Sequence, residues 1–377
     1  MSTDLLFTRP AFYIFLLTVM VGLSMLKNKS AMRNAFLFAA SLFFYWKTSA
    51  AFVFLLLFST VADWGIAAVM DRSENLQRRL WLTLSVLINL GLLGFFKYAY
   101  FFADSSAMLF DTSFRVESIL LPVGISFYTF QTLSYSIDIY RGKLKPTRDP
   151  IAFAAFVSFF PQLVAGPIER ASKLLPQIER SRSFDKDLAI SGLRLILWGM
   201  FKKVVVADTC ARMADTIFES PESFSGPTLM LGVFYFAFQI YGDFSGYSDI
   251  AIGTGRLFGI RLSTNFKFPY FSRDIAEFWR RWHISLSSWF RDYLYIPLGG
   301  SRGSQYEVIR NVAVIFIVSG FWHGANWTFI VWGGLNALYF VPLILLGLNR
   351  KNIEVVASDK LLPNLVEVGQ ILLTFFL

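Results

Sequence analysis

The chain has 377 residues, of which 55% are hydrophobic, 18% aromatic and only 16% charged, with a net charge of +9. Soluble domains carry about 25% charged residues, so this composition excludes an ordinary soluble protein and predicts an all-α, polytopic membrane protein. The single cysteine, Cys210, excludes an internal disulfide and a cysteine-rich zinc site.

The basic residues gather in short connectors between apolar runs. This positive-inside pattern predicts contact with the headgroups of a lipid bilayer and argues against nucleic acid as a partner. Residues 10–26 form the first apolar run, and Lys27, Lys29 and Arg33 follow it directly. We expect an uncleaved first span whose N-terminus faces away from the cytoplasm.

The later apolar runs predict further spans, since a membrane span needs about 20 apolar residues. Residues 34–70 are too long for one span and predict a hairpin of two, with Trp46 and Lys47 near the bend. Residues 101–117 are predicted to form an outer loop. The other predicted spans are residues 80–102, 118–140, 188–206, 228–246, 311–321 and 330–348.

Two stretches depart from the alternation of spans and loops. Residues 151–168 are apolar but are flanked by basic clusters and interrupted by proline and glycine, which predicts a re-entrant or membrane-surface segment. Residues 265–295 place apolar side chains at spacings of three and four, which predicts an amphipathic helix at the membrane interface. Residues 371–377 are apolar but too short to cross. We expect one integral membrane domain over residues 1–377, truncated at its C-terminus.

The chain has only two histidines, and both lie in aromatic sequence, His283 in EFWRRWHISLSSW and His323 in SGFWHGANWTF. An ionisable group in a hydrophobic span is costly and is therefore a candidate functional residue. Histidine also exchanges protons near neutral pH. The alternative for His323 is a histidine that only hydrogen-bonds across a helix interface, and for His283 an interfacial residue in an aromatic belt. A metal site is disfavoured, because HExxH spacing is absent and soft ligands are too few.

The sequence YGDFSGYSD, residues 241–249, places Asp243 and Ser245 among glycines at the end of a predicted span. These groups are candidates for substrate binding. The alternative is a polar turn whose carboxylates are satisfied by neighbouring groups. A Ser-His-Asp triad is disfavoured, because no GxSxG motif is present.

Five stretches resemble the membrane-bound O-acyltransferase (MBOAT) family, in its bacterial alginate O-acetylation branch. The D-alanyl transferases of teichoic acid synthesis are a sister group in that branch. The stretches follow the family's order and are LPVGISFYTFQTLSYSIDIYRG (121–142), FFPQLVAGPIER (159–170), YGDFSGYSDIAIG (241–253), NFKFPYFSRDIAEFWRRWHISLSSWFRDYLYIPLGG (265–300) and SGFWHGANWTFIVWGGLNA (319–337).

The resemblance implies a helical core with re-entrant or interfacial helices around a tunnel. It also implies that His323 is the conserved, buried histidine of the family and that His283 is its second frequent histidine. The implied enzyme is an O-acyltransferase of the bacterial inner membrane, with several passes and no bound cofactor.

The implied reaction moves an acyl group, which we expect to be acetyl, from a cytoplasmic thioester donor such as acetyl-CoA. The implied acceptor is a hydroxyl of an extracytoplasmic cell-surface polysaccharide. Transfer is expected either directly or through an extracytoplasmic acetyltransferase as partner protein.

We hypothesise that His323 is the general base that takes a proton from the acceptor hydroxyl. His283 is expected to hold the donor, aided by arginines that pair with phosphates of a CoA-like carrier; the alternative is a structural role on the funnel wall. Asn326 and Trp327 are candidates for stabilising the developing oxyanion. The residues expected to bind substrate or donor are Arg280, Arg281, Trp282, Asn326, Trp327, Asp243 and Ser245.

Three other functions fit parts of the sequence. The first is D-alanyl transfer to teichoic acid. The second is a transporter whose histidines form a proton relay, although no duplicated halves are visible. The third is a non-catalytic scaffold that anchors an extracellular acetylase.

Overall fold

The computed structural model describes residues 5–26, 29–110, 119–357 and 361–377. Over these residues the regular structure is helical throughout, with no β-strand, which confirms the all-α prediction. The chain divides into two compact units. Unit 1 comprises Met1–Leu93 and Leu121–Ser263, and unit 2 comprises Gly94–Leu120 and Thr264–Leu377.

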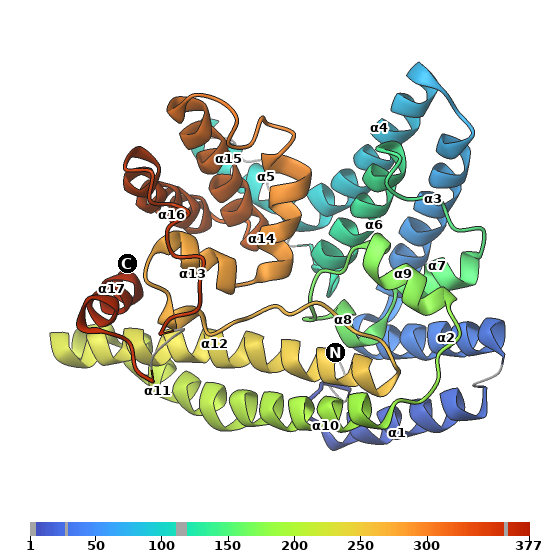
Figure 1. Ribbon diagram of the computed structural model, residues 1–377, viewed down its shortest axis with the longest axis horizontal. Helices are drawn as coiled ribbons and strands as arrows, with labels where there is room; N and C mark the ends of the chain where they lie inside the picture. The colour runs from blue at the N-terminus through green and yellow to red at the C-terminus, as the bar shows by residue number, and fades with distance from the viewer. Residues whose placement is uncertain (1–4, 27–28, 111–118, 358–360) are drawn as a thin grey trace. The chain divides into compact units, whose positions relative to one another are not determined.

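Unit 1 contains helices of very different length, from 4 residues in α8 to 32 residues in α12 (Figure 1). They are α1 (Pro10–Met25), α2 (Ser30–Ser49), α3 (Val53–Asp71), α4 (Asn75–Leu93), α6 (Ile125–Tyr140), α7 (Pro150–Val157), α8 (Phe160–Leu163), α9 (Ala171–Glu179), α10 (Lys186–Met200), α11 (Asp208–Glu219) and α12 (Gly226–Leu257). A π-helical segment, η3 (Phe201–Ala207), joins α10 to α11.

Unit 2 contains shorter helices and the longer pair α15 and α16, which lie side by side in Figure 1. Its helices are α5 (Ala99–Phe110), α13 (Ile275–Arg281), α14 (Ile284–Phe290), α15 (Gln305–His323), α16 (Trp327–Leu345) and α17 (Leu365–Phe376). Two π-helical turns, η2 (Gly94–Tyr98) and η6 (Arg291–Tyr295), precede α5 and follow α14.

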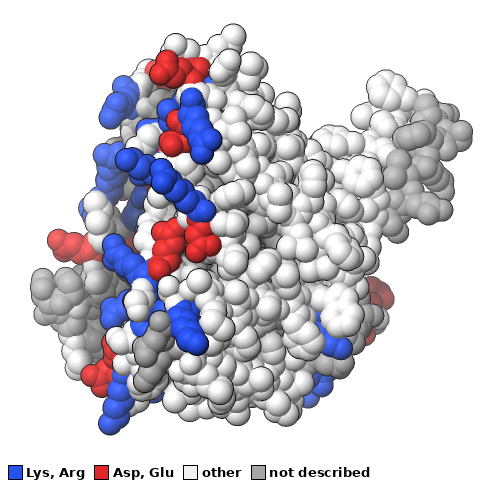
Figure 2. Space-filling view, turned by 90° about the vertical axis from the view of Figure 1, so that its right-hand side faces the viewer, with Lys and Arg blue, Asp and Glu red and all other residues white. Residues whose placement is uncertain are grey.

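Within the described part of the chain, three helical stretches are long and apolar enough to cross a membrane, namely Ser30–Asp71, Asn75–Phe110 and Trp327–Leu345. On the face shown in Figure 2, lysine and arginine side chains gather along one edge, and broad areas carry no charged side chain. Uncharged surfaces of this extent suit contact with lipid rather than water.

The predicted helical segments are present, but several of their boundaries differ from prediction. The predicted hairpin over residues 34–70 is instead two helices that meet at a sharp bend, where Ala50 has a φ of 46°. Beyond this bend α3 packs mainly against α4 and α6. The predicted outer loop over residues 101–117 is wrong as far as residue 110, because α5 continues to Phe110; residues 111–117 lie outside the described residues.

The predicted re-entrant segment over residues 151–168 is two short helices, α7 and α8, with nearly every side chain buried in protein. The backbone break between them is stabilised from within the fold, since Gln131 Nε2 donates to the carbonyl oxygen of Phe156 at 2.7 Å. Irregular backbone in a membrane protein requires such partners, because lipid offers none.

Glycines set how closely α10 and α12 approach each other in unit 1. Gly192 and Gly199 on α10 face Gly253 and Gly246 on α12, and a Cβ at Gly253 would lie 2.6 Å from the carbonyl oxygen of Gly192. Small residues allow this close packing where no hydrophobic effect drives helices together. The two helices consequently run side by side (Figure 1).

We predict that Gly253→Leu lowers the thermal unfolding midpoint of the detergent-solubilised protein. Overpacking of this kind costs about 1–3 kcal/mol. The matched control is Gly91→Leu, since a Cβ at Gly91 meets nothing within 4 Å. Equal midpoints for the two variants would contradict the packing role.

Candidate active site

A sharp bend in the chain positions His283. The backbone at His283 has a φ of 43°, in the left-handed region, and separates α13 from α14. The prediction of one amphipathic helix over residues 265–295 is therefore wrong. The segment contains a 3-10 turn (Pro269–Phe271), two short helices and a π-helical turn. The bend turns the His283 side chain inward, where it is only 1% exposed.

Asn265 holds this bend. Its backbone carbonyl accepts from the N–H of Ile284 at 2.9 Å. Its side-chain Oδ1 accepts from the hydroxyl of Ser285 at 2.9 Å and lies 3.1 Å from Nδ1 of His283. These bonds offset the cost of about 1–2 kcal/mol for a left-handed residue that is not glycine.

The same contact fixes the tautomer of His283. The backbone N–H of Ser285 can only donate, and it points at Asn265 Oδ1 at 3.4 Å, so that atom is the amide oxygen. His283 Nδ1 must therefore be the protonated nitrogen, and the lone pair of the ring lies on Nε2. A neutral histidine in this tautomer is ready to accept a proton at Nε2.

His323 is positioned by the contact between α15 and α16. A Cβ on Gly320 would collide with the carbonyl oxygen of Phe329, and one on Gly333 with that of Phe316, so both positions require glycine for this approach. His323 is the last residue of α15. Helix α16 begins after Asn326.

The structure brings the two histidines together, although they are distant in sequence. Their ring centroids lie 6.3 Å apart. Trp332 packs edge-on against His323 at 5.2 Å, and Trp322 lies 6.1 Å from the ring of His283. Among the described residues, the buried Nε2 of His323 has no hydrogen-bond partner. The pair is a compact centre that can accept and pass on a proton.

Lys97 is a further charged group at this centre, and the sequence analysis missed it. It donates to the backbone carbonyl of Trp322, and its ammonium group lies 5.2 Å from the centroid of the Trp322 ring. The available signal was a lone lysine within the apolar run of residues 80–102, since a charge inside a span is a candidate functional residue.

A pocket of about 460 Å³ opens close to the histidines. Its wall includes Ser319, four residues before His323 on α15, and Ser287, four residues after His283 on α14. Ser319 and His323 both belong to α15, where residues four apart share one helix face, so this part of the pocket wall lies about one helical turn from His323.

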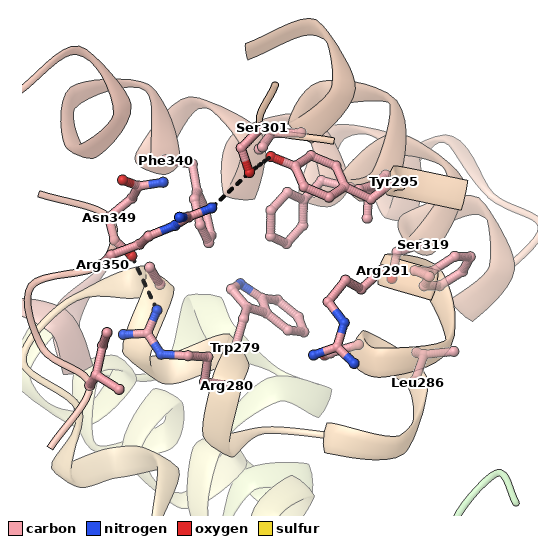
Figure 3. Close-up of a pocket in the computed structure, with 17 residues that line it drawn as sticks. Trp279, Arg280, Leu286, Arg291, Tyr295, Ser301, Ser319, Phe340, Asn349 and Arg350 are labelled. Atoms are coloured by element: carbon pink, nitrogen blue, oxygen red, sulfur yellow. Dashed lines mark hydrogen bonds between the residues drawn. The ribbon is translucent and has the colours of Figure 1, made fainter. Parts of the chain in front are cut away.

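The pocket combines an aromatic interior with arginine side chains (Figure 3). Trp279 projects into it, and Arg280, Arg291 and Arg350 lie around it. The Arg280 guanidinium donates to the carbonyl of Asn349 at 3.2 Å, so its position is fixed by the chain that follows α16. Such a site fits a ligand with both an apolar or aromatic part and negative charge.

The other residues predicted on the donor side have different environments. Arg281 donates to Glu277 at 2.5 Å, so its charge is paired within α13. Trp282 stacks on Phe278 with 5.5 Å between ring centroids and an interplanar angle of 15°. Of the three predicted donor-side residues Arg280, Arg281 and Trp282, only Arg280 lines the pocket.

Asn326 and Trp327 lie at the start of α16. The Asn326 side chain caps this helix by accepting from the backbone N–H of Thr328 at 3.0 Å. Trp327 is 58% exposed and packs against Phe101 at 5.5 Å. Both residues are close in sequence to His323, and the described structure gives each a packing or capping role.

Asp243 and Ser245 belong to unit 1, whereas both histidines belong to unit 2. The motif at residues 241–249 lies inside α12 and not in a turn, but its polar groups are satisfied by neighbouring groups, as the alternative reading of this motif expected. Asp243 pairs with Lys203 at 2.6 Å, and the Ser245 hydroxyl accepts from Lys202 at 2.9 Å. These contacts join α12 to the π-helical segment η3.

Over the described ranges, no group of three or more His, Cys, Asp or Glu side chains is placed to hold a metal ion. The fold and the paired histidines define a class: a helical membrane protein with two neighbouring histidines and a pocket lined by arginine and aromatic side chains. A family model narrows this class. The model of the membrane-bound O-acyltransferase family matches residues 143–360, more than half of the chain. The chain belongs to this family and is an O-acyltransferase.

Individual relatives agree with this assignment. The "Probable alginate O-acetylase" of Azotobacter vinelandii is 44% identical over 348 residues, which cover 89% of this chain and 68% of that protein. A peptidoglycan O-acetyltransferase of Helicobacter pylori is 38% identical over 366 residues, covering 89% and 69%. A teichoic acid D-alanyltransferase of Streptococcus thermophilus is 32% identical over 240 residues, covering 60% and 57%.

The burial of His283 predicts a dependence of stability on pH. Burial, and secondarily the neighbouring His323, lowers the pKa of His283 well below 6.5. As the pH falls through 6.5, the unfolded chain takes up a proton that the folded ring does not. The unfolding midpoint is therefore expected to fall between about pH 7.5 and about pH 5.5. The loss should be smaller in His283→Gln; an equal loss in both proteins would contradict this account.

The hydrogen bond from His283 to Asn265 predicts a second result. Asn265→Leu removes the oxygen that fixes the tautomer of His283 and should therefore lower kcat. A positioned general base contributes a rate factor of about 10²–10⁴, and the variant should lose part of this factor. Asn265→Asp keeps an acceptor oxygen and should retain more activity. Ser285→Ala leaves the His283 contact in place and is the control. A kcat for Asn265→Leu equal to that of Ser285→Ala would show that the tautomer is unimportant.

Proposed function

We propose that this enzyme transfers an acetyl group from a cytoplasmic thioester, such as acetyl-CoA, to hydroxyls of an extracytoplasmic cell-surface polysaccharide. The observation that carries the proposal is the pair of imidazoles with the buried, unpartnered Nε2 of His323. The choice of acetyl follows the relatives, since those named as O-acetylating match about 90% of this chain and the D-alanylating ones about 60%.

In the proposed step, Nε2 of His323 takes the proton of the acceptor hydroxyl as its oxygen attacks the thioester carbonyl. A C–O bond forms, the C–S bond breaks, and the leaving thiolate receives the proton from the imidazolium. Positioned base catalysis of this kind contributes about 10²–10⁴-fold. Orientation of donor and acceptor supplies a further part of the rate.

The donor is proposed to bind in the pocket lined by Arg280, Arg291 and Arg350. A nucleotide thioester carries phosphates that guanidinium groups bind well, and an aromatic base that stacks on side chains such as Trp279. Ser319 of the pocket wall lies one helical turn before His323 on α15. A donor seated there would have its thioester close to His323.

His283 is proposed to act through His323. Its ring lies beside His323 and is not among the residues that line the pocket. We therefore favour a role in positioning the proton-accepting centre over the expected role in holding the donor.

The names of the relatives support the proposed acceptor, and the family resemblance is the ground for the proposed partner. The Azotobacter relative is named for alginate and the Helicobacter relative for peptidoglycan, which are both extracytoplasmic polymers. We propose a surface polysaccharide as acceptor, the bacterial inner membrane as location, and an extracytoplasmic acetyltransferase as the partner that receives or passes on the acetyl group.

Replacing the proposed base gives the first test of this function. His323→Ala in proteoliposomes should reduce acetyl transfer from acetyl-CoA by at least about 10²-fold, because the proton acceptor is lost. Donor binding, measured separately with a non-hydrolysable thioester analogue, should change little. Full transfer by the variant would refute the assignment of His323.

The two proposed roles also separate in kinetics. Arg280→Gln should raise the donor KM with little change in kcat, because Arg280 contacts the donor in both ground and transition state. His283→Ala should lower kcat with a smaller change in KM. Arg302→Gln, an exposed arginine in unit 2, is the matched control. The reverse pattern, with KM raised by His283→Ala, would assign His283 to the donor.

A further inference from the structure

Unit 1 contains a cavity that the acyl-transfer proposal does not use. Its volume is about 760 Å³, and its wall is formed by α1, the start of α2, the connector before α10 and the end of α12. Three arginines line it, Arg33, Arg182 and Arg256. We refer to it as the three-arginine cavity. Its size is within the range of small-molecule sites in proteins.

The positive charge of this cavity is only partly balanced by protein carboxylates. None of the three arginines forms an ion pair with a described residue. Arg182 donates to the carbonyl of Gln177 at 3.1 Å, and Arg256 donates to the hydroxyl of Ser191 at 2.5 Å. Both partners are neutral, so the cavity keeps its positive charge.

Asp185 is the carboxylate that lines the three-arginine cavity. It is already engaged as the N-cap of α10, where it accepts from the backbone N–H of Leu188 at 3.0 Å. The three arginines and this one aspartate leave a net charge of +2 on the cavity wall.

Arg33 shows most clearly that an anion is needed. It is only 4% exposed, and its Nη2 donates to the carbonyls of Ile178 and Arg180 at 3.2 and 2.8 Å. Among the described residues, its buried Nε and Nη1 have no hydrogen-bond partner. A buried guanidinium with two unused donor atoms is costly unless an acceptor meets it.

Arg182 adds a second charge at the same place. Arg182 lines the same cavity as Arg33, and burial, and secondarily the positive charge of Arg33, lowers the pKa of Arg182. Arginine nevertheless stays charged in proteins. Two neighbouring guanidinium groups form a fork that binds a phosphate through several charge-assisted hydrogen bonds.

The part of the wall that α1 forms is largely apolar and continues onto exposed helix surface. Met20 and Leu23 of α1 line the cavity. On the same helix Leu17 is 61% exposed and Val21 is 59% exposed, as suits a surface that faces lipid tails. A ligand with a phosphate in the cavity and hydrocarbon chains along α1 would match both parts.

We propose that the three-arginine cavity binds the phosphate of an anionic phospholipid, whose acyl chains lie along α1. Basic pockets between helices are a common form of lipid recognition at membrane surfaces. The bound lipid would join α1, α2 and the connector before α10 through one headgroup. This inference does not depend on the acyl-transfer function.

The test uses the full chain in detergent, with lipid binding followed by native mass spectrometry. Phosphatidylglycerol should bind wild-type protein, and phosphatidylcholine, which has no net charge, should bind far less. Arg182→Gln should weaken phosphatidylglycerol binding by at least about tenfold, because a charge-assisted contact is lost. Arg79→Gln, at an exposed arginine of unit 1, is the matched control and should bind as wild type does.

Arg182→Gln is the deciding variant, since Arg33 also holds the end of α9 and its replacement can disturb folding. Unchanged binding of phosphatidylglycerol by Arg182→Gln would overturn the proposal. Equal binding of the two lipids by wild-type protein would overturn it as well. Inorganic phosphate and coenzyme A serve as competitors: if either displaces phosphatidylglycerol at equal concentration, the cavity binds a soluble phosphate compound and the lipid assignment is wrong.

Discussion

The active site depends on the hydrogen bonds of Asn265. One amide oxygen accepts from His283 and Ser285, and the backbone carbonyl of the same residue accepts from Ile284. Without these bonds nothing would offset the strain of the left-handed backbone at His283, and the tautomer of its ring would not be fixed. The bend they stabilise turns His283 from the surface of an amphipathic segment into the protein, beside His323.

The same constraint operates through the rest of the molecule, because a chain this apolar must satisfy its polar groups internally. Glu277 is 2% exposed, and its carboxylate forms ion pairs with the guanidinium groups of Arg273 at 3.0 Å and Arg281 at 2.5 Å. Asp63, fully buried between α3 and α4, accepts from Ser85 and Asn89. Groups that carry unused hydrogen-bonding capacity, such as His323 and Arg33, are therefore the exceptions that indicate function.

The sequence allowed the helical class and the likeness to the acyltransferase family to be predicted, because hydropathy and motifs are local properties. The pairing of His283 with His323 could not be derived from spacing, since it depends on the contact of α15 with α16 through Gly320 and Gly333. Periodicity also missed the bend at His283, which tertiary hydrogen bonds impose on a segment with helical spacing. The ion pair of Asp243 with Lys203 on a neighbouring segment could not be seen in the sequence either, and substrate binding by Asp243 stays a prediction.

The central claim is that the two histidines work as one proton-accepting centre. A double-mutant cycle measures this directly, with kcat for acetyl transfer determined for His283→Ala, His323→Ala and the double variant. Residues that act as a unit are strongly non-additive. We predict that the double variant is no slower than His323→Ala alone. Multiplicative losses, in which the double variant falls by the product of the two single effects, would show that the histidines act independently and would contradict this account.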